Sequence, residues 1–348
     1  MKHRICKKTN LLLIVLILAI MGISGCKSGN VLEEVSTNES IKGMTLPADE
    51  DLIVVGFSQL GSESVWRSAN SLSVQGTLTE ENGYFLLFNN ARQRQENQIK
   101  AIRSFISQRV DYIVFSPVTE EGWETVLQEA KDAGIPVIIV DRKVSGVDES
   151  LYTTWIGTDA VDEGEKAGFW LESHLNKKGR VNEDINIVVL QGTIGSSAQL
   201  GRTIGFNSVA LKHDNWVILE QASGDFTIAK GKEVMQTMLE TYDDIDVVVS
   251  QNDDMTFGAI DAMKENGRTY GESGDTIVIS FDAVKEALLM VEKGEINVDV
   301  ECNPEQGPYI HEIIQKLEQG EAVEKYYYVE EMVFTKGNVS EYLPDRTY

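Results

Sequence analysis

Cysteine is scarce in this chain of 348 residues, which excludes a fold held together by disulfides. Cys6 and Cys26 both lie in an N-terminal segment that is predicted below to be an export signal and its cleavage site. Only Cys302 then remains in the folded part, and one cysteine cannot form an intramolecular disulfide. Stability must therefore come from a packed core.

Metal-binding and catalytic motifs are also lacking. The histidines share no metal-ligand spacing, and neither His-Glu-x-x-His nor Cys-x-x-Cys occurs. The sequence contains no Gly-x-Ser-x-Gly, no Walker loop and no Gly-x-Gly-x-x-Gly. We therefore expect a protein without a metal or cofactor that is not an enzyme. Glu63 and Asp141 could be imagined as an acid/base pair, but a role as acceptors for hydroxyl groups is the favoured interpretation.

Basic residues are outnumbered, with 31 Lys and Arg against 55 Asp and Glu. Nucleic-acid binding needs basic patches, so this balance argues against it. It also argues against attraction to anionic lipid head groups. A solvated acidic surface is sufficient to explain the composition.

The N-terminus has the pattern of an export signal. A basic head at residues 2–8 precedes an apolar run at residues 11–23, and Ser24-Gly25-Cys26 follows it. The run is short for a transmembrane helix, which needs about 20 apolar residues. The small residues before the cysteine resemble a bacterial lipobox. This predicts a signal peptide over residues 1–25 and lipidation of Cys26, which would anchor the protein to the outer face of the cell membrane.

Residues 26–50 are polar and carry no apolar periodicity, so a flexible lipidated tether is predicted there. The remaining chain is too long for one core. It divides into two successive series of short apolar runs, which read as buried strands alternating with amphipathic helices. The strands are expected at 52–57, 84–88, 111–115, 136–140, 185–190, 216–220, 246–250 and 276–280. The helices are expected at 95–109, 120–133, 197–213, 227–241 and 254–266.

This alternation predicts an α/β protein with two doubly wound parallel-sheet lobes. Ligands of such sheets bind beyond the carboxyl ends of the strands, and polar residues gather there. Carboxylates, arginines and amides at these positions suit the hydroxyls of a sugar, and aromatic rings suit its C–H faces. The candidates from this pattern include Ser58, Ser62, Glu63, Trp66, Arg67, Asp141, Arg142, Thr193, Arg202, Phe226, Asn252 and Asp282.

Simpler structural roles remain open for several of these residues. Asp141 could cap the next segment, Ser62 could be a helix N-cap, and Trp66 could belong to the core. Asp253 could be a first-turn helix charge that faces water, and for Asp254 that interpretation is preferred.

Several segments together resemble the periplasmic-binding-protein group that serves sugar ABC transporters, of the ribose/galactose type. They are GFSQLGSESVWR, QENQIKAIRSFISQRVDYIVFSPV, EAKDAGIPVIIVDR, LQGTIGSSAQLGR, GDFTIAKGKEVM and QNDDMTFGAIDAMKENG. GSESVWR, SPVTEEGWETVL and GDFTIAKGKEVM look closest to the galactofuranose-binding members. The resemblance implies the type 1 periplasmic-binding-protein fold, with three hinge crossovers between the lobes. The N-terminal lobe would comprise residues 51–154 and 303–331, and the C-terminal lobe residues 155–302 and 332–348.

Carried over residue by residue, the resemblance assigns ligand contacts to both lobes. It implies the candidates named above, with Asp141 and Arg142 matching an Asp-Arg pair that holds sugar hydroxyls and Thr193 as a weaker candidate. The segment Glu301-Cys302-Asn303 varies in the family, so no ligand contact is chosen within it.

The expected function is capture of a monosaccharide, galactofuranose or a related aldose, by a monomer that delivers it to an ABC transporter permease. A sensor that presents the sugar to a receptor or histidine kinase is the alternative. A lobed repressor would need a helix-turn-helix before residue 50, where the signal and tether are predicted instead.

Overall fold

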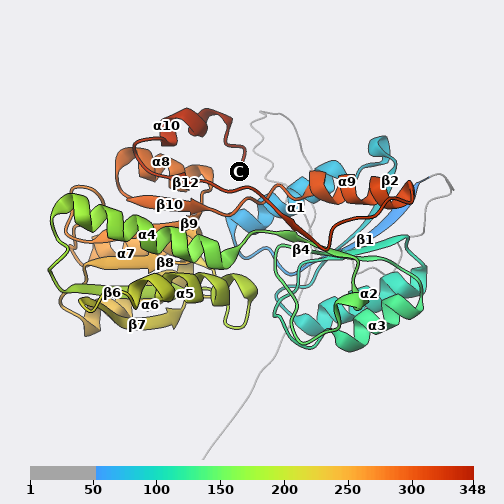
Figure 1. Cartoon of the computed structure of the whole chain (residues 1–348), viewed down its shortest axis with the longest axis horizontal. Coiled ribbons are helices and arrows are strands. Elements are labelled where there is room, and N and C mark those ends of the chain that lie inside the picture. Colours follow the sequence, from blue (N-terminus) through green and yellow to red (C-terminus); the bar gives the residue numbers. More distant parts are fainter. Residues whose placement is uncertain (1–51) are drawn as a thin grey trace, which may run out of the picture. The chain divides into compact units, whose positions relative to one another are not determined.

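The computed structural model describes residues 52–348, which form two α/β lobes, each built on a six-stranded sheet (Figure 1). The predicted signal peptide, Cys26 and the predicted tether lie outside these residues. Among the described helices, none is both long enough and apolar enough to cross a membrane.

The first sheet has the strand order β11-β5-β4-β3-β1-β2, and every neighbouring pair is parallel. Its strands are β1 (Ile53–Gln59), β2 (Tyr84–Asn90), β3 (Tyr112–Phe115), β4 (Val137–Val140), β5 (Thr154–Gly157) and β11 (Tyr326–Tyr328). Helices α1 (Val65–Thr77) and α9 (Gly307–Glu318) cover one face, and α2 (Gln95–Gln108) and α3 (Glu124–Asp132) cover the other (Figure 1). Ile310, Ile313 and Ile314 of α9 complete the core on the first of these faces.

The second sheet has the order β12-β10-β9-β8-β6-β7, and only the edge strand β12 is antiparallel to its neighbour. Its strands are β6 (Ile185–Gln191), β7 (Trp216–Ser223), β8 (Val247–Ser250), β9 (Ile277–Asp282), β10 (Val298–Glu301) and β12 (Val333–Phe334). Helices α4 (Ala160–Lys178) and α5 (Ser197–Ala210) pack on one face. Helices α6 (Ile228–Thr241), α7 (Asp253–Glu265) and α8 (Lys285–Lys293) pack on the other, and α10 (Val339–Tyr342) lies beside α8.

The chain crosses between the two sheets three times, after β5, after β10 and after β11. This confirms the predicted fold of two doubly wound lobes joined by three crossovers. The first crossing comes after Gly157, not after residue 154 as the sequence suggested, because β5 pairs with β4 and β11 before the chain leaves the sheet.

Short 3-10 turns complete the description, at Glu80–Asn82, Glu149–Leu151 and Leu343–Asp345. The eight predicted strands and five predicted helices all occur, with ends shifted by a few residues. Because most of the neighbouring strands are parallel, their carboxyl ends meet at one edge of each sheet, and the loops that follow them build the site.

Candidate functional site

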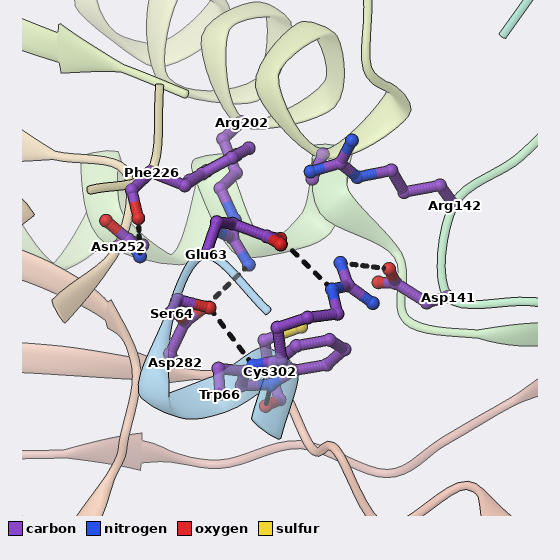
Figure 2. Close-up of a pocket in the computed structure, with 12 residues that line it drawn as sticks. Glu63, Ser64, Trp66, Asp141, Arg142, Arg202, Phe226, Asn252, Asp282 and Cys302 are labelled. Atoms are coloured by element: carbon purple, nitrogen blue, oxygen red, sulfur yellow. Dashed lines mark hydrogen bonds and ion pairs between the residues drawn. The ribbon is translucent and has the colours of Figure 1, made fainter. Parts of the chain in front are cut away.

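A pocket with an empty volume of about 300 Å³ lies among loops that follow the strands of both sheets (Figure 2). The first lobe contributes Glu63, Ser64, Trp66, Arg67, Asp141 and Arg142. The second lobe contributes Ala198, Arg202, Phe226, Asn252 and Asp282, and the crossover after β10 contributes Cys302.

Arg67 organises the first-lobe wall. Helix α1 begins after Ser64, whose hydroxyl accepts a hydrogen bond from the backbone N–H of Arg67. This turn directs the guanidinium between Glu63, at 3.1 Å from Nε, and Asp141, at 2.7 Å from Nη2. Both carboxylates are nearly buried, so each depends on this shared cation.

Arg142 is buried beside this cluster and has no carboxylate partner of its own within residues 52–348. One Nη1–H donates to the carbonyl of Val118 at 2.7 Å, whereas Nε has no partner among the described residues. Burial, together with the positive charge of Arg67, lowers the pKa of Arg142 to about 10. A buried guanidinium with an unused donor is suited to a ligand hydroxyl.

Arg202 plays the corresponding part in the second lobe. Its Nε donates to Glu163 Oε2 at 2.6 Å, and Nη2 lies 3.3 Å from Asp282 Oδ1. Burial acts to lower the pKa of Arg202, but the charges of Glu163 and Asp282 outweigh it and raise that pKa well above its ordinary value. Burial in turn raises the pKa of Asp282. Glu163 does not line the pocket and holds Arg202 from behind.

Two aromatic rings face the pocket from opposite lobes. Trp66 is buried, and its indole N–H donates to the carbonyl of Cys302 on the crossover. Phe226 is packed so closely over Gly192 that any side chain there would overlap the ring. The guanidinium of Arg142 lies 5.4 Å from the centre of the Phe226 ring. The pocket therefore has apolar surfaces for C–H groups between its charged walls.

Three of the lining residues adopt a left-handed backbone, with φ of 61° at Asp141, 60° at Phe226 and 109° at Asp282. Non-glycine residues rarely occupy this region, and where they do, they often belong to functional sites. Each comes at or just after a strand end, where the sharp change of direction turns its side chain into the pocket.

The two lobes touch at residues that neighbour the pocket lining in sequence. The Val65 N–H donates to Asp254 Oδ2 at 3.1 Å, and the Lys143 N–H donates to Ser197 Oγ at 2.9 Å. The Glu120 N–H donates to the carbonyl of Gly195 at 3.2 Å. These contacts describe a closed form of the cleft.

Three predicted site residues do not line this pocket. Ser58 is fully buried in β1, Ser62 is exposed in the loop before α1, and Thr193 lies in the loop after β6. The N-cap considered for Ser62 belongs to Ser64.

The expectation that Asp254 faces water is wrong. Its side chain is buried because it meets the backbone of the other lobe at Val65.

Sequence reasoning missed Ser64, Ala198 and Cys302 as lining residues. For Ser64 a signal existed, because it precedes the first helical residue in the way of an N-cap. Cys302 lies in the segment where no residue could be chosen.

Glu63 and Asp141 converge on one arginine and not on a position where a substrate bond could lie between them, which favours their role as acceptors.

Comparisons with known proteins identify relatives in sequence and in fold. A family model described as a periplasmic binding protein domain matches residues 55–322. The galactofuranose-binding protein YtfQ of Escherichia coli is 40% identical over 297 residues, which cover 84% of this chain and 88% of that protein. A crystal structure from Mycobacterium smegmatis in complex with β-D-fucofuranose has a TM-score of 0.81 and 40% identity, covering 85% of this chain and 95% of that one. The binding protein of an arabinose ABC transporter from Shewanella sp. ANA-3, bound to α- and β-L-arabinofuranose, has a TM-score of 0.79 and 40% identity, with 84% and 95% covered.

Proposed function

The chain belongs to the periplasmic-binding-protein family, and from this premise we propose that it captures a monosaccharide between its lobes and delivers it to a sugar ABC transporter permease. The observation that carries the proposal is the pocket itself. Three buried arginines, three lining carboxylates and two aromatic rings converge there from both lobes. This is the set of groups that can accept from and donate to the hydroxyls of one sugar while covering its C–H faces.

The preferred ligand is galactofuranose or a closely related furanose. Relatives at about 40% identity include a protein named for galactofuranose and structures with fucofuranose and arabinofuranose bound. When a pyranose occupies a pocket that is shaped for a furanose, some polar groups of the pocket lose their hydrogen-bond partners. Each such group costs about 1–3 kcal/mol of binding free energy.

The protein is expected to bind the sugar without changing it. Among the described residues that line the pocket, the only nucleophile of high intrinsic reactivity is Cys302. Burial raises the pKa of its thiol well above the ordinary value, which keeps it protonated and unreactive. A sensory role, in which the closed form is recognised by a receptor, uses the same pocket.

A thermal-shift screen over pentoses and hexoses tests the proposal. Ligand at 100 times its Kd should stabilise the protein by about 2.7 kcal/mol. We expect the largest shift with sugars that populate furanose forms, such as galactose and arabinose, and intact sugar in the recovered sample by NMR. Turnover of the sugar, or no shift with any sugar, would refute the proposal.

The proposed location is outside the cytoplasm, with a monomer held at the membrane by lipid on Cys26. A Cys26→Ala variant with its signal removed should leave the membrane fraction. Persistent membrane association after signal cleavage would contradict the lipid anchor.

A further inference from the structure

We propose that Glu331, which lies outside the pocket, is a positioning residue that holds Arg202 in place through one proton shared with Glu163. The inference rests on the proposed function, because Arg202 matters here as a wall of the sugar pocket. It concerns the hinge, where Glu163, Cys302 and Glu331 come together near the three crossovers.

The geometry brings the carboxyl groups of Glu163 and Glu331 close together, and among the described residues neither Glu163 Oε1 nor Glu331 Oε1 has a donor. Glu163 is fully buried in the first turn of α4; its Oε2 accepts from Arg202, and its Oε1 has no partner among the described residues. Glu331, on the crossover from β11 to β12, also has a buried oxygen, Oε1, without a partner. A ligating atom from each of Glu163, Glu331 and Cys302 lies within 4.8 Å of the other two.

Two carboxylate oxygens are both acceptors, so they can stay together in a buried place only if one carries a proton. Among the described residues, the two nearby cations each have another carboxylate as an ion-pair partner. Arg202 serves both Glu163 and Asp282, and Lys166 pairs with Asp162 at 2.7 Å. The remaining neighbour, Cys302, is a thiol whose pKa is raised by burial.

Burial, together with the negative charge of Glu163, outweighs the positive charges of Arg202 and Lys166 and raises the pKa of Glu331 to about 11. A protonated Glu331 therefore donates to the free oxygen of Glu163 at neutral pH. This leaves the other oxygen of Glu163 for Arg202. The chain of contacts runs from the third crossover through Glu163 and Arg202 to Asp282 in the pocket.

The contacts predict how variants of Glu331 will behave. Glu331→Gln replaces the shared proton with an amide N–H donor and should keep sugar affinity within about twofold of the parent protein. Glu331→Ala leaves the Glu163 oxygen unpaired and should weaken affinity by about tenfold. Glu330→Gln, at the exposed neighbouring position, is the matched control and should have no effect.

The experiment combines two readouts on the protein and these three variants. Calorimetry with L-arabinose and with D-galactose measures affinity. Infrared difference spectra without sugar, between parent and Glu331→Gln at neutral pH, should show the C=O stretch of one protonated carboxyl. If neither sugar binds the parent protein, the proposed function is in question, and the spectrum still tests the shared proton.

Three results would overturn the inference. One is the lack of the protonated-carboxyl band in a folded parent protein. The second is a Glu331→Gln variant as weak as Glu331→Ala. The third is stoichiometric binding of ZnCl₂ that Glu331→Gln abolishes, since a cation would then take the place of the proton.

Discussion

Asp141 combines three features at one position: a left-handed backbone, a nearly buried carboxylate, and hydrogen bonds from Arg67 and Ser116. Asp141→Asn keeps the shape and tolerates the backbone, because asparagine also visits the left-handed region. It removes the charge that holds Arg67. We expect sugar affinity to fall by about 2–5 kcal/mol, as for other broken buried charge pairs.

Calorimetry on folded Asp141→Asn measures this loss, with exposed Asp214→Asn as the control. An affinity within about twofold of the parent would remove Asp141 from the site. Asp141→Ala should lose stability in addition, since alanine is strained at φ 61°.

We expect Asp254 to make closure depend on pH. In the closed form, burial raises the pKa of Asp254 to about 6, the negative charge of Glu63 adds to the shift, and the hydrogen bond from Val65 opposes it. With the lobes apart, the carboxyl group should return toward its ordinary pKa of about 3.9. The closed form then binds a proton more tightly. Its advantage is present at low pH and is lost as pH rises through about 6.

Sugar affinity should accordingly rise by about tenfold between pH 7 and pH 5. Asp254→Asn should flatten this profile, because an amide does not titrate. Calorimetry at several pH values measures sugar affinity in the parent protein and in Asp254→Asn. If affinity depends on pH equally in both, another group is responsible for the pH dependence.

Among single residues, those that directly follow a strand, such as Asp141 and Asn252, were predictable from the sequence. The fold places such residues at the carboxyl edge of the sheet, where the pocket lies. The sequence did not predict the partners behind them. Glu163 and Glu331 are separated by most of the second lobe in sequence, and their contact depends on how the crossovers meet. Asp254 reads as an ordinary first-turn helix charge, and only the approach of the other lobe buries it.

Helices α4 and α5 approach each other through glycines, and this contact positions Arg202. A Cβ on Gly205 would overlap the carbonyl of Val161, and one on Gly164 would overlap the carbonyl of Arg202. Gly205→Ala should therefore force the helices apart and destabilise the protein by about 1–3 kcal/mol. It should also weaken sugar binding, because Arg202 lies one turn away in α5.

Gly76→Ala in α1 is the matched control, because a Cβ there meets nothing within 4 Å. This change should leave stability unchanged or raise it by up to about 1 kcal/mol. Thermal unfolding compares the two variants, and equal melting temperatures would show that the helix contact tolerates a methyl group.

Helices and strands with a strong local pattern of apolar residues were predictable from the sequence. Strands that form only by pairing with a strand far away in the sequence were not. Strand β6 is apolar apart from Asn186 and Gln191, and α2 has apolar residues at helical spacing. Helix α1 carries Trp66 and Arg67, yet it is rich in polar residues and was not predicted. Strands β11 and β12 are short, and they exist because β5 and β10 offer free edges.

Closure should be visible in the whole molecule. The lobes touch through Val65, Glu120 and Lys143, and a sugar that contacts both walls binds this closed form better than an open one. Small-angle scattering should give a smaller radius of gyration with saturating sugar than without it. Identical curves for a protein that binds the sugar in calorimetry would contradict hinge closure.

The second and third crossovers also set the order in which the molecule can be completed during synthesis. The first lobe begins with β1, but its sheet lacks β11 and its core lacks the isoleucines of α9 until nearly the whole chain has been made. Domains ordinarily fold as units while the ribosome works, from the N-terminus onward. Here the N-terminal lobe must wait for residues 307–328, so the nascent chain stays unfolded for longer, which is the state in which a protein can be threaded through a membrane.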